Sequence, residues 1–496
     1  MRLLILKKYI AYNLAPMTTS KDIQEPILPG TVSAYPTKKF FMSMLTRDIA
    51  LIDAIMDLLD NCIDGIHRKK KDSARSTPYN GFHAEITINE NEFILKDNCG
   101  GIPLDNAINY AFKMGRSDNY HADDNLPTVG MYGIGMKRAI FKMGLEADIF
   151  SHHRDDRFLV QIPPDWATAP NWLFNYSQLT KKKIEGILEV EGTLIKVKNL
   201  HKNIKQQFSD KTGFIRNLEL ELRNHYGYIV QQGFLITLNG KEIQPLSLNI
   251  LTSNDGKEKT IKPYVYTSDI DGVSTEVIIG FYRPLANDDE IQRELDGGIA
   301  KSLTENAGIT VICNDRVVLY CDKSFLTGWG ETPVPKYHTQ FISIAGVVHF
   351  RSNDPIKLPV TTTKRGLDTS SAVYAEVKNK IKDGLRIFTS FTNNWKSPTE
   401  ERAKLFENSS KINALQPGQA KSNLFKLEGK RGDDALYQIP NLPKPNEAVR
   451  DKFVTISFMR EKEKVDAIRN YFLDGEQRSA AEVGGWCFDE IHLQVE

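Results

Sequence analysis

The sequence predicts an α/β protein with two substantial domains, followed by a small C-terminal element. Three patterns support this expectation. Apolar residues recur at helical spacing between Ile49 and Leu59. Residues 84–96 alternate apolar and polar side chains, as two half-buried strands do. Strand and helix patterns then interleave from about 206 to 394, which favours a second α/β unit.

Length, charge and cysteine content exclude several classes of protein. The 496 residues suggest about three domains at ~150 residues each. A formal net charge of +1 excludes a protein whose whole surface attracts nucleic acid, but not a local basic patch. No apolar stretch reaches the ~18 residues of a transmembrane helix. The five cysteines are scattered and never spaced as CxxC, so we expect reduced thiols in a cytoplasmic protein, without a zinc site or a disulfide framework.

Changes in composition divide the chain into five segments. The opening residues carry their lysines after the apolar run, the reverse of a secretory signal, and either Met1 or Met17 suits as the start. We expect an N-terminal arm at 1–30, a first α/β domain at 31–205, a second α/β domain at 206–394, a polar linker or irregular extension at 395–447, and a small C-terminal element at 448–496.

The elements of the first domain follow in order. The first helical pattern ends near Gly65, a natural C-terminal stop, so that the basic residues 67–71 form a solvated loop. Strands at 84–88 and 92–96 are joined by a turn at 89–91. We expect a short helix at 104–115, a polar loop at 117–128, a helix opened by the glycines at 130–135, and strands within 147–162 and 187–198.

The second domain has equally local signals. A helix at 216–233 ends in glycine, and Asn239-Gly240 marks the turn of a hairpin. We expect strands at 275–282 and 308–320, a helix at 370–388, and, in the C-terminal element, a strand at 453–458 and a helix at 463–473.

Two acidic motifs indicate chemistry. Asp57 and Asn61 are four residues apart, so they share one face of the first helix. A carboxylate there can accept a proton from water, and an amide oxygen can bind Mg²⁺. Asp97 ends a strand and precedes Gly100 and Gly101, where a ligand can approach the backbone. A solvent-facing polar stripe and an ordinary tight turn are the alternatives for these motifs taken singly.

A glycine-rich motif follows. Gly130, Gly133 and Gly135 free the backbone amides to face a phosphate at the start of a helix, and Lys137 adds a positive charge. The Walker pattern GxxxxGK[ST] is absent, and a glycine motif of this kind is weak evidence alone.

In their order and spacing these motifs resemble the GHKL superfamily of ATPases. Its members include the gyrase B subunit, the MutL mismatch-repair protein, the ninety-kilodalton heat-shock chaperone, sensor histidine kinases and the Microrchidia (MORC) ATPases. DLLDNCID at 57–64 is similar to the family's Glu-x-x-x-Asn motif, and DNCGG at 97–101 is similar to its Asp-x-Gly-x-Gly motif. GMYGIG at 130–135 matches the motif Gly-x-x-Gly-x-Gly, and Gly192-Thr193 is similar to a Gly-Thr pair that occurs late in the family's domain.

The resemblance implies a Bergerat-type α/β sandwich that binds ATP and Mg²⁺, followed by a transducer-like α/β domain. LPVTTTKRGLD at 358–368 resembles the transducer loop that sends a lysine to the γ-phosphate, although an ordinary surface lysine is the alternative. The resemblance implies that Asp57 polarises the attacking water and that Asn61 binds Mg²⁺. It implies that Asp97 holds the adenine amine, with Gly101, Ile102 and Thr193 beside it. The phosphates would be bound by Gly130, Gly133, Gly135 and Lys137 beneath a lid at about 113–130, and Lys364 would contact the γ-phosphate.

Two residues depart from the family pattern. Asp57 replaces the usual glutamate and is one methylene shorter, which implies a closer approach of the helix, slow hydrolysis, or ATP that is bound and barely turned over. Cys99 replaces the first glycine of its box, so it requires ordinary backbone angles, with Gly100 supplying the conformational freedom.

The expected function is an ATPase that acts as a nucleotide-gated clamp. ATP binding would order the lid and close two protomers as a homodimer, and hydrolysis would reopen them. Layout favours a MORC-like protein with a DNA or protein partner, in a DNA-related or genome-defence process. Basic clusters at 67–71 and 181–183 are candidate phosphate contacts, although solvated loops are favoured. The alternative is a chaperone-like ATPase acting on client proteins, whereas a sensor kinase lacks its phosphoacceptor histidine because no His precedes His67.

Overall fold

The computed structural model describes most of the chain outside its N-terminus. The described residues are 37–70, 78–115, 125–130, 133–210, 213–253, 259–287, 290–291, 306–396, 400–416, 418, 424–426, 435–445, 456, 459–472 and 479–495. The expected arm at 1–30, the central part of the expected lid and all but Ile456 of the strand expected at 453–458 lie outside them.

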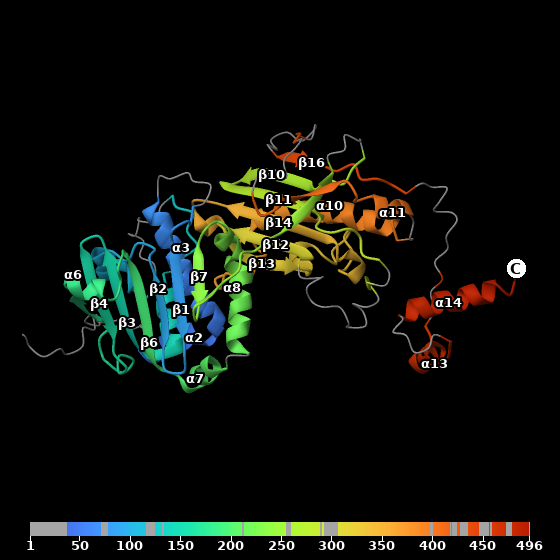
Figure 1. Ribbon diagram of the computed structural model, residues 1–496. Helices are drawn as coiled ribbons and strands as arrows, with labels where there is room; N and C mark the ends of the chain where they lie inside the picture. Colours follow the sequence, from blue (N-terminus) through green and yellow to red (C-terminus); the bar gives the residue numbers. More distant parts are fainter. Residues whose placement is uncertain are drawn as a thin grey trace, which may run out of the picture.

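The first layer is an eight-stranded mixed sheet with the order β5-β4-β3-β6-β2-β1-β7-β8 (Figure 1). Strand β1 pairs with β7 in parallel, and the other neighbours in the sheet are antiparallel. The strands are β1 His83–Ile88, β2 Phe93–Asp97, β3 Gly144–His153, β4 Asp156–Ile162, β5 Asn175–Gln178, β6 Gly192–Leu200, β7 Leu235–Leu238 and β8 Lys241–Glu242.

Helices bury their apolar faces against this sheet. Leu59 of α3, Ile140 of α5 and Leu222 of α8 share one core with Phe93 and Ile149 of the strands. Burial of such side chains contributes about 1.5–3 kcal/mol each. The helices of this part are α2 Lys38–Arg47, α3 Leu51–Lys69, α4 Leu104–Asn106, the π-helical turn η1 Ala107–Ala111, α5 Gly135–Met143, α6 Lys181–Glu185, α7 Lys202–Ser209 and α8 Phe214–Gln231.

Helix α3 does not end at Gly65, contrary to the sequence-based expectation. It continues to Lys69, so His67, Arg68 and Lys69 belong to its last turn rather than to a solvated loop. The glycine serves close packing, because a Cβ at this position would lie 2.7 Å from the carbonyl oxygen of Cys99. Arg68 and Lys69 thereby line the cavity described below.

The boundary expected at 205 also differs from the structure. The hairpin β7–β8 belongs to the first sheet, because β7 pairs with β1. Helix α8, which precedes the hairpin, packs in the core of the same sheet. The hairpin turn itself is as expected, with Asn239 and Gly240 both in the left-handed region at φ 49° and 80°. A local turn signal identifies a hairpin but not the sheet that accepts it. The expected strand at 187–198 begins only at Gly192, and the basic cluster at 181–183 lies in the short helix α6.

A second, six-stranded sheet follows with the order β13-β12-β14-β11-β10-β16. Side chains alternate between its faces: Tyr264 and Tyr266 belong to one core with Phe388 of α10, and Val265 belongs to another with Tyr228 of α8. In Figure 1 helix α8 lies between the two sheets. The strands are β10 Tyr264–Ile270, β11 Val273–Phe281, β12 Gly308–Cys313, β13 Arg316–Asp322, β14 Ile344–Arg351 and β16 Leu436–Gln438, and the helices are η3 Phe325–Thr327, η4 Thr339–Phe341, η5 Pro355–Lys357 and α10 Ala372–Asn394.

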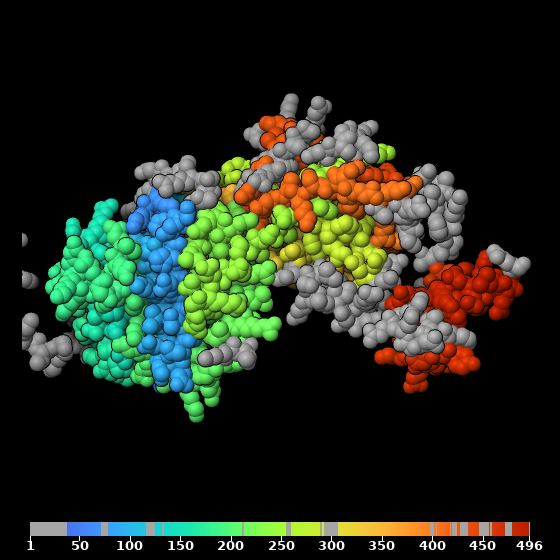
Figure 2. Space-filling model, in the orientation of Figure 1, coloured from blue at the N-terminus to red at the C-terminus, as the bar shows by residue number. Residues whose placement is uncertain are grey.

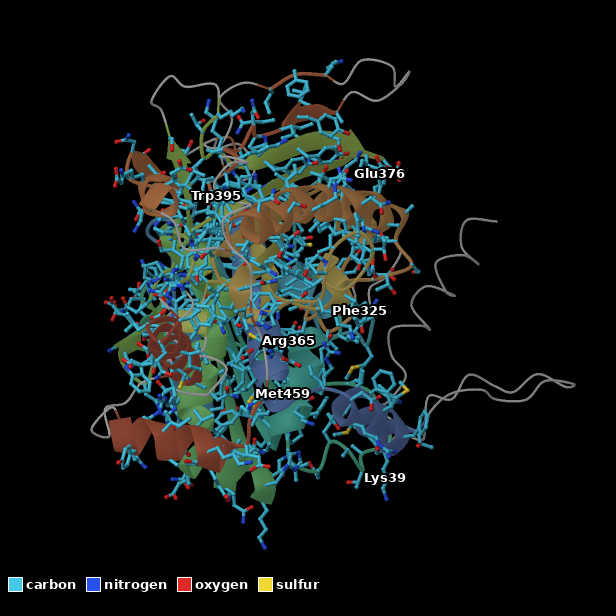
Figure 3. The ribbon with its side chains drawn as sticks, turned by 90° about the vertical axis from the view of Figure 1, so that its right-hand side faces the viewer. Lys39, Phe325, Arg365, Glu376, Trp395 and Met459 are labelled. Atoms are coloured by element: carbon cyan, nitrogen blue, oxygen red, sulfur yellow. The ribbon has the colours of Figure 1, made fainter. Side chains whose placement is uncertain are left out.

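The expected linker at 395–447 is folded onto the second domain wherever the structure describes it. After helix α11 (Glu400–Lys404), strand β15 (Ser409–Asn413) pairs with β9 (Asn249–Ser253), and β16 extends the second sheet by pairing with β10. Trp395, labelled in Figure 3 near the end of α10, donates its indole N–H to the carbonyl oxygen of Pro443 at 3.2 Å. Such short strands carry no periodicity of their own, so only tertiary pairing reveals them.

The C-terminal element is a pair of helices, α13 (Lys462–Phe472) and α14 (Ala480–His492), which contact each other and lie apart from both sheets in Figure 2. Ser479 and Glu482 form a capping box that begins α14. Among the described residues, no helix combines the length and apolar character required to cross a bilayer. All five cysteines lie in the described part of the chain, and none forms a disulfide there.

Candidate functional site

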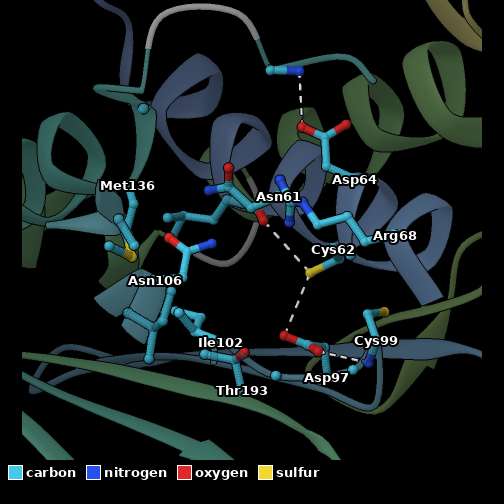
Figure 4. A pocket seen from close by; sticks show the side chains of 18 of the residues that line it. Asn61, Cys62, Asp64, Arg68, Asp97, Cys99, Ile102, Asn106, Met136 and Thr193 are labelled. Atoms are coloured by element: carbon cyan, nitrogen blue, oxygen red, sulfur yellow. Dashed lines mark hydrogen bonds between the residues drawn. The ribbon is translucent and has the colours of Figure 1, made fainter. Parts of the chain in front are cut away.

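A single cavity of about 750 Å³ gathers the residues that the sequence singled out (Figure 4). It opens between α3, the ends of β2 and β6, the start of α5 and a loop of the second domain. All eleven candidate residues line it: Asp57, Asn61, Asp97, Gly101, Ile102, Gly130, Gly133, Gly135, Lys137, Thr193 and Lys364.

Helix α3 presents one polar group after another to this cavity. Asn61 is the one exposed residue between Ala54 and Asp64, on a helix face that is otherwise buried or half-buried. Asp57, one turn earlier, is only 5% exposed, and its carboxylate is paired with the Arg138 guanidinium of α5. The i and i+4 spacing therefore places a carboxylate and an amide together, as expected.

Asp97, the last residue of β2, lies in the wall of the cavity beside Cys62 of α3. Its Oδ1 accepts a hydrogen bond from the backbone N–H of Cys99 at 2.7 Å, while Oδ2 lies 3.6 Å from Sγ of Cys62. Burial raises the pKa of Asp97 to about 6, against the hydrogen bond from Cys99, which lowers it. A buried acceptor of this kind is suited to a ligand that donates an N–H group.

Glycines allow the backbone segments around Asp97 to pack closely against each other. A Cβ on Gly192 would lie 1.9 Å from the carbonyl oxygen of Asp97, and one on Gly101 would lie 2.2 Å from that of His152. Gly100 and Gly101 have φ values of 112° and 69°, whereas Cys99 has no left-handed φ. The expectation that Gly100 supplies the conformational freedom in place of Cys99 is therefore confirmed.

The glycine-rich segment lies over α3. Asp64 accepts hydrogen bonds from the backbone N–H groups of Val129 and Gly130, at 2.7 and 2.9 Å. Lys137 donates to the carbonyl oxygens of Gly133 and, at 2.8 Å, Ala111. Desolvation lowers the pKa of Lys137 to about 8, so it remains mostly protonated at neutral pH. The segment thus brings a cation and a helix N-terminus to the cavity.

Lys364 reaches the same cavity from the second domain. Its Nζ lies 2.7 Å from Oδ2 of Asp60 and 3.4 Å from Oδ1 of Asp57. Burial alone would lower the pKa of Lys364, but the two carboxylates outweigh burial and raise it, so the side chain stays charged. The neighbouring Arg365, labelled in Figure 3, pairs with Asp53 at 2.7 Å, which ties this loop to α3.

Sequence reasoning missed the buried network behind Lys364. Asp60 accepts from Arg316 Nε at 3.1 Å and from the Tyr226 hydroxyl at 2.6 Å. Burial would raise the pKa of Asp60, but Lys364 and Arg316 hold it below its ordinary value. Arg316 is itself only 2% exposed. Arg316 lies 256 residues from Asp60 in the chain, and no local sequence pattern indicates such a pair.

The cavity also has a basic rim. Arg68 and Lys69 from the last turn of α3 line it together with Arg138, with His153 at the end of β3 and with Arg154, which follows that strand. His153 lies 2.6 Å, through Nδ1, from the carbonyl oxygen of Gly100. The cavity lining as a whole holds six Lys and Arg side chains against four Asp and Glu, and this excess of positive charge suits a ligand with several negative charges.

Comparison with known proteins agrees with this geometry. Residues 49–193 match the model of the family described as histidine kinase-, DNA gyrase B- and HSP90-like ATPase. The match begins just before α3 and ends at Thr193, so it includes the segments of the first sheet that border the cavity. No curated protein matches the chain. The segment 49–193 is therefore a GHKL-type ATPase domain, and a further α/β domain follows it in the chain.

Proposed function

We propose that the cavity binds ATP with Mg²⁺ and that the chain hydrolyses ATP to drive closure of a homodimer. The observation that carries this proposal is the convergence of all eleven candidate residues, drawn from five separate segments, on one cavity of about 750 Å³. Cavities of this size accommodate a small-molecule ligand or cofactor.

The adenine end is Asp97. Its Oδ2 would accept the exocyclic amine, with Thr193 beside it and Gly101 and Ile102 allowing the base to approach the backbone. The phosphate end is the glycine-rich segment, where Gly133, Gly135 and Lys137 would hold the phosphate oxygens. The basic rim extends this positive field.

The acid–amide pair on α3 suits the metal and the water. Asn61 fits Mg²⁺ because its side chain is exposed on a largely buried stretch of helix and lines the cavity, and Mg²⁺ prefers oxygen ligands. Bound Mg²⁺ would offset phosphate charge. Asp57 would hold and deprotonate the attacking water, and Arg138 and Lys364 beside it would stabilise the charge that develops on the phosphate.

Nucleotide binding is expected to fall on both sides of neutral pH. ATP requires ionised Asp97, whose pKa is about 6, so affinity should drop roughly tenfold per pH unit below that value. ATP also favours protonated Lys137, whose pKa is about 8, so affinity should fall again above it. Titration of a fluorescent ATP analogue from about pH 5 to about pH 9, with saturating Mg²⁺ to keep the phosphates ionised, measures the profile. A flat profile below pH 6 would contradict the role of Asp97.

Closure is tied to Lys364. This lysine pairs with Asp60 and Asp57, and a γ-phosphate would compete with these carboxylates for its charge. The loop of the second domain would then move with the presence of the third phosphate. Lys364 would thus have two positions, one paired with the carboxylates and one paired with the γ-phosphate.

A non-hydrolysable ATP analogue is therefore expected to convert the monomer into a dimer. Light scattering should show the apparent mass about doubling with the analogue, and not with ADP, because only the former offers a γ-phosphate to Lys364. Repeating the measurement with duplex DNA tests a MORC-like partner, since the net charge of +1 leaves DNA contact to a local surface. A monomer under all conditions would refute the clamp.

A further inference from the structure

Two cysteines lie beside the carboxylate that we assign to adenine. Cys62 projects from α3 and Cys99 follows β2, and both thiols are buried in the wall of the cavity (Figure 4). Sγ of Cys62, Sγ of Cys99 and a carboxylate oxygen of Asp97 all lie within 4.8 Å of one another. The chain thus gathers two soft ligands and one hard ligand at one point.

The spacing of these atoms matches a tetrahedral zinc site. Zn²⁺ binds thiolate sulfur at about 2.3 Å and carboxylate oxygen at about 2.0 Å, so a tetrahedral ion separates such a pair by about 3.5 Å and two sulfurs by about 3.8 Å. Sγ of Cys62 lies 3.6 Å from Oδ2 of Asp97. The remaining separations require a contraction of at most about 1 Å, which a change in side-chain torsion can supply.

Asp97 is already oriented for such a ligand role. Its Oδ1 is held by the backbone N–H of Cys99 at 2.7 Å, which leaves Oδ2 directed at Sγ of Cys62. Outer hydrogen bonds of this kind orient metal-binding carboxylates. Three protein ligands leave a fourth position open toward the cavity, as in zinc sites that keep a solvent ligand.

We propose that Cys62, Cys99 and Asp97 form a binding site for a thiophilic divalent cation of the Zn²⁺ class, and that this cation excludes the adenine base. Two thiolates select a soft ion over Mg²⁺ or Ca²⁺, so the site is separate in chemistry from the Mg²⁺ position at Asn61. The exclusion rests on the proposed function, because it requires Oδ2 of Asp97 to serve both ligands.

Cation binding is coupled to proton release. Hydrogen bonding to Cys99 and burial raise the pKa of the Cys62 thiol, and burial raises that of Cys99. A cation must displace these protons to bind, so its affinity increases with pH through the neutral range. This direction is opposite to that expected for nucleotide affinity above pH 8.

The test begins with metal alone on the full chain. Titration with Co²⁺ should produce a sulfur-to-cobalt charge-transfer band in the near ultraviolet, and Zn²⁺ should abolish it by displacement. Cys62→Ala and Cys99→Gly should each weaken Zn²⁺ binding by about a hundredfold or more, since even an outer-shell partner contributes ten- to a hundredfold. Cys487→Ala, which removes a half-buried thiol on α14, is the matched control and should bind Zn²⁺ as the unaltered chain does.

The second measurement is affinity for a fluorescent ATP analogue at fixed free Zn²⁺. At about ten times the zinc dissociation constant, competition should raise the apparent nucleotide dissociation constant about tenfold in the unaltered chain but not in the Cys62→Ala/Cys99→Gly variant. The variant also controls for zinc bound by the nucleotide itself.

The outcomes separate the two proposals. A missing cobalt band, or a band that survives in the double variant, overturns the metal site. Zinc binding without loss of nucleotide affinity overturns the exclusion. Failure to bind nucleotide even without zinc, with the cobalt band intact and lost in the double variant, rejects the ATP proposal and supports the metal site.

Discussion

Asp97→Asn is expected to abolish ATP binding, with a loss of affinity of at least about a thousandfold, or about 4 kcal/mol. The reason is the fixed orientation of this side chain. Oδ1 accepts from the backbone N–H of Cys99 at 2.7 Å, so the carbonyl oxygen of an asparagine must stay there. Its NH₂ group then takes the place of Oδ2 and faces the adenine amine, donor against donor. Sites built to hydrogen-bond a ligand group discriminate by ten-thousandfold or more when that pairing fails.

The measurement is titration of a fluorescent ATP analogue against the unaltered chain and the variant. A buried neutral amide replaces a carboxyl whose pKa is raised by burial, so the fold should not lose stability, and a thermal melt checks this. Asp155→Asn, at a fully exposed carboxylate in the turn between β3 and β4, is the matched control and should bind normally. Ordinary binding by Asp97→Asn would refute the assignment of the adenine pocket.

The candidate site was predictable because each motif is local. A helix carries Asp57 and Asn61 on one face at i and i+4, and glycines around Asp97 and Gly135 mark backbone that a ligand approaches. Each motif alone also suits a turn or a polar stripe. Their shared cavity depends on sheet order, which places β2 beside β6 and brings Asp97 and Thr193 together.

The features that sequence reasoning missed are those decided by distant contacts. Gly65 has the signal of a helix end, but the approach of Cys99 explains the glycine and the helix continues to Lys69. Strand β16 has three residues and no periodicity, and it forms because β10 offers an edge. Local propensity is a weak prior wherever tertiary pairing decides.

The buried ion pairs between the domains follow the same rule. Asp60 on α3 and Arg316 on β13 are both almost fully buried, so loss of Asp60 would leave the charge of Arg316 buried and uncompensated. The same carboxylate holds Lys364. One side chain of the ATPase domain therefore engages two cations of the following domain, Arg316 and Lys364, and this gives a direct physical connection between the cavity and the second sheet.

Asp57→Asn is expected to retain nucleotide binding and to lower ATP turnover by about a hundredfold or more, the usual range for removal of a general base. Asparagine keeps the shape of the side chain and an oxygen for Arg138, but it cannot accept a proton from water. Asp57→Ala should lose turnover to the same extent and also some stability, because two buried cations, Arg138 and Lys364, lose a shared anion.

Turnover at saturating ATP and binding of a non-hydrolysable analogue separate catalysis from affinity. The control is Asp53→Asn, one turn earlier on α3, which pairs with Arg365 of the second domain and does not line the cavity. Asp53→Asn removes an ion pair between α3 and the loop that carries Lys364 and Arg365. The turnover of this variant therefore shows how a weaker contact between the helix and the loop affects hydrolysis by itself. If Asp57→Asn hydrolyses ATP as fast as the unaltered chain, Asp57 is not the base. If Asp53→Asn is as slow as Asp57→Asn, the effect of Asp57 comes from docking of the Lys364 loop rather than from proton transfer.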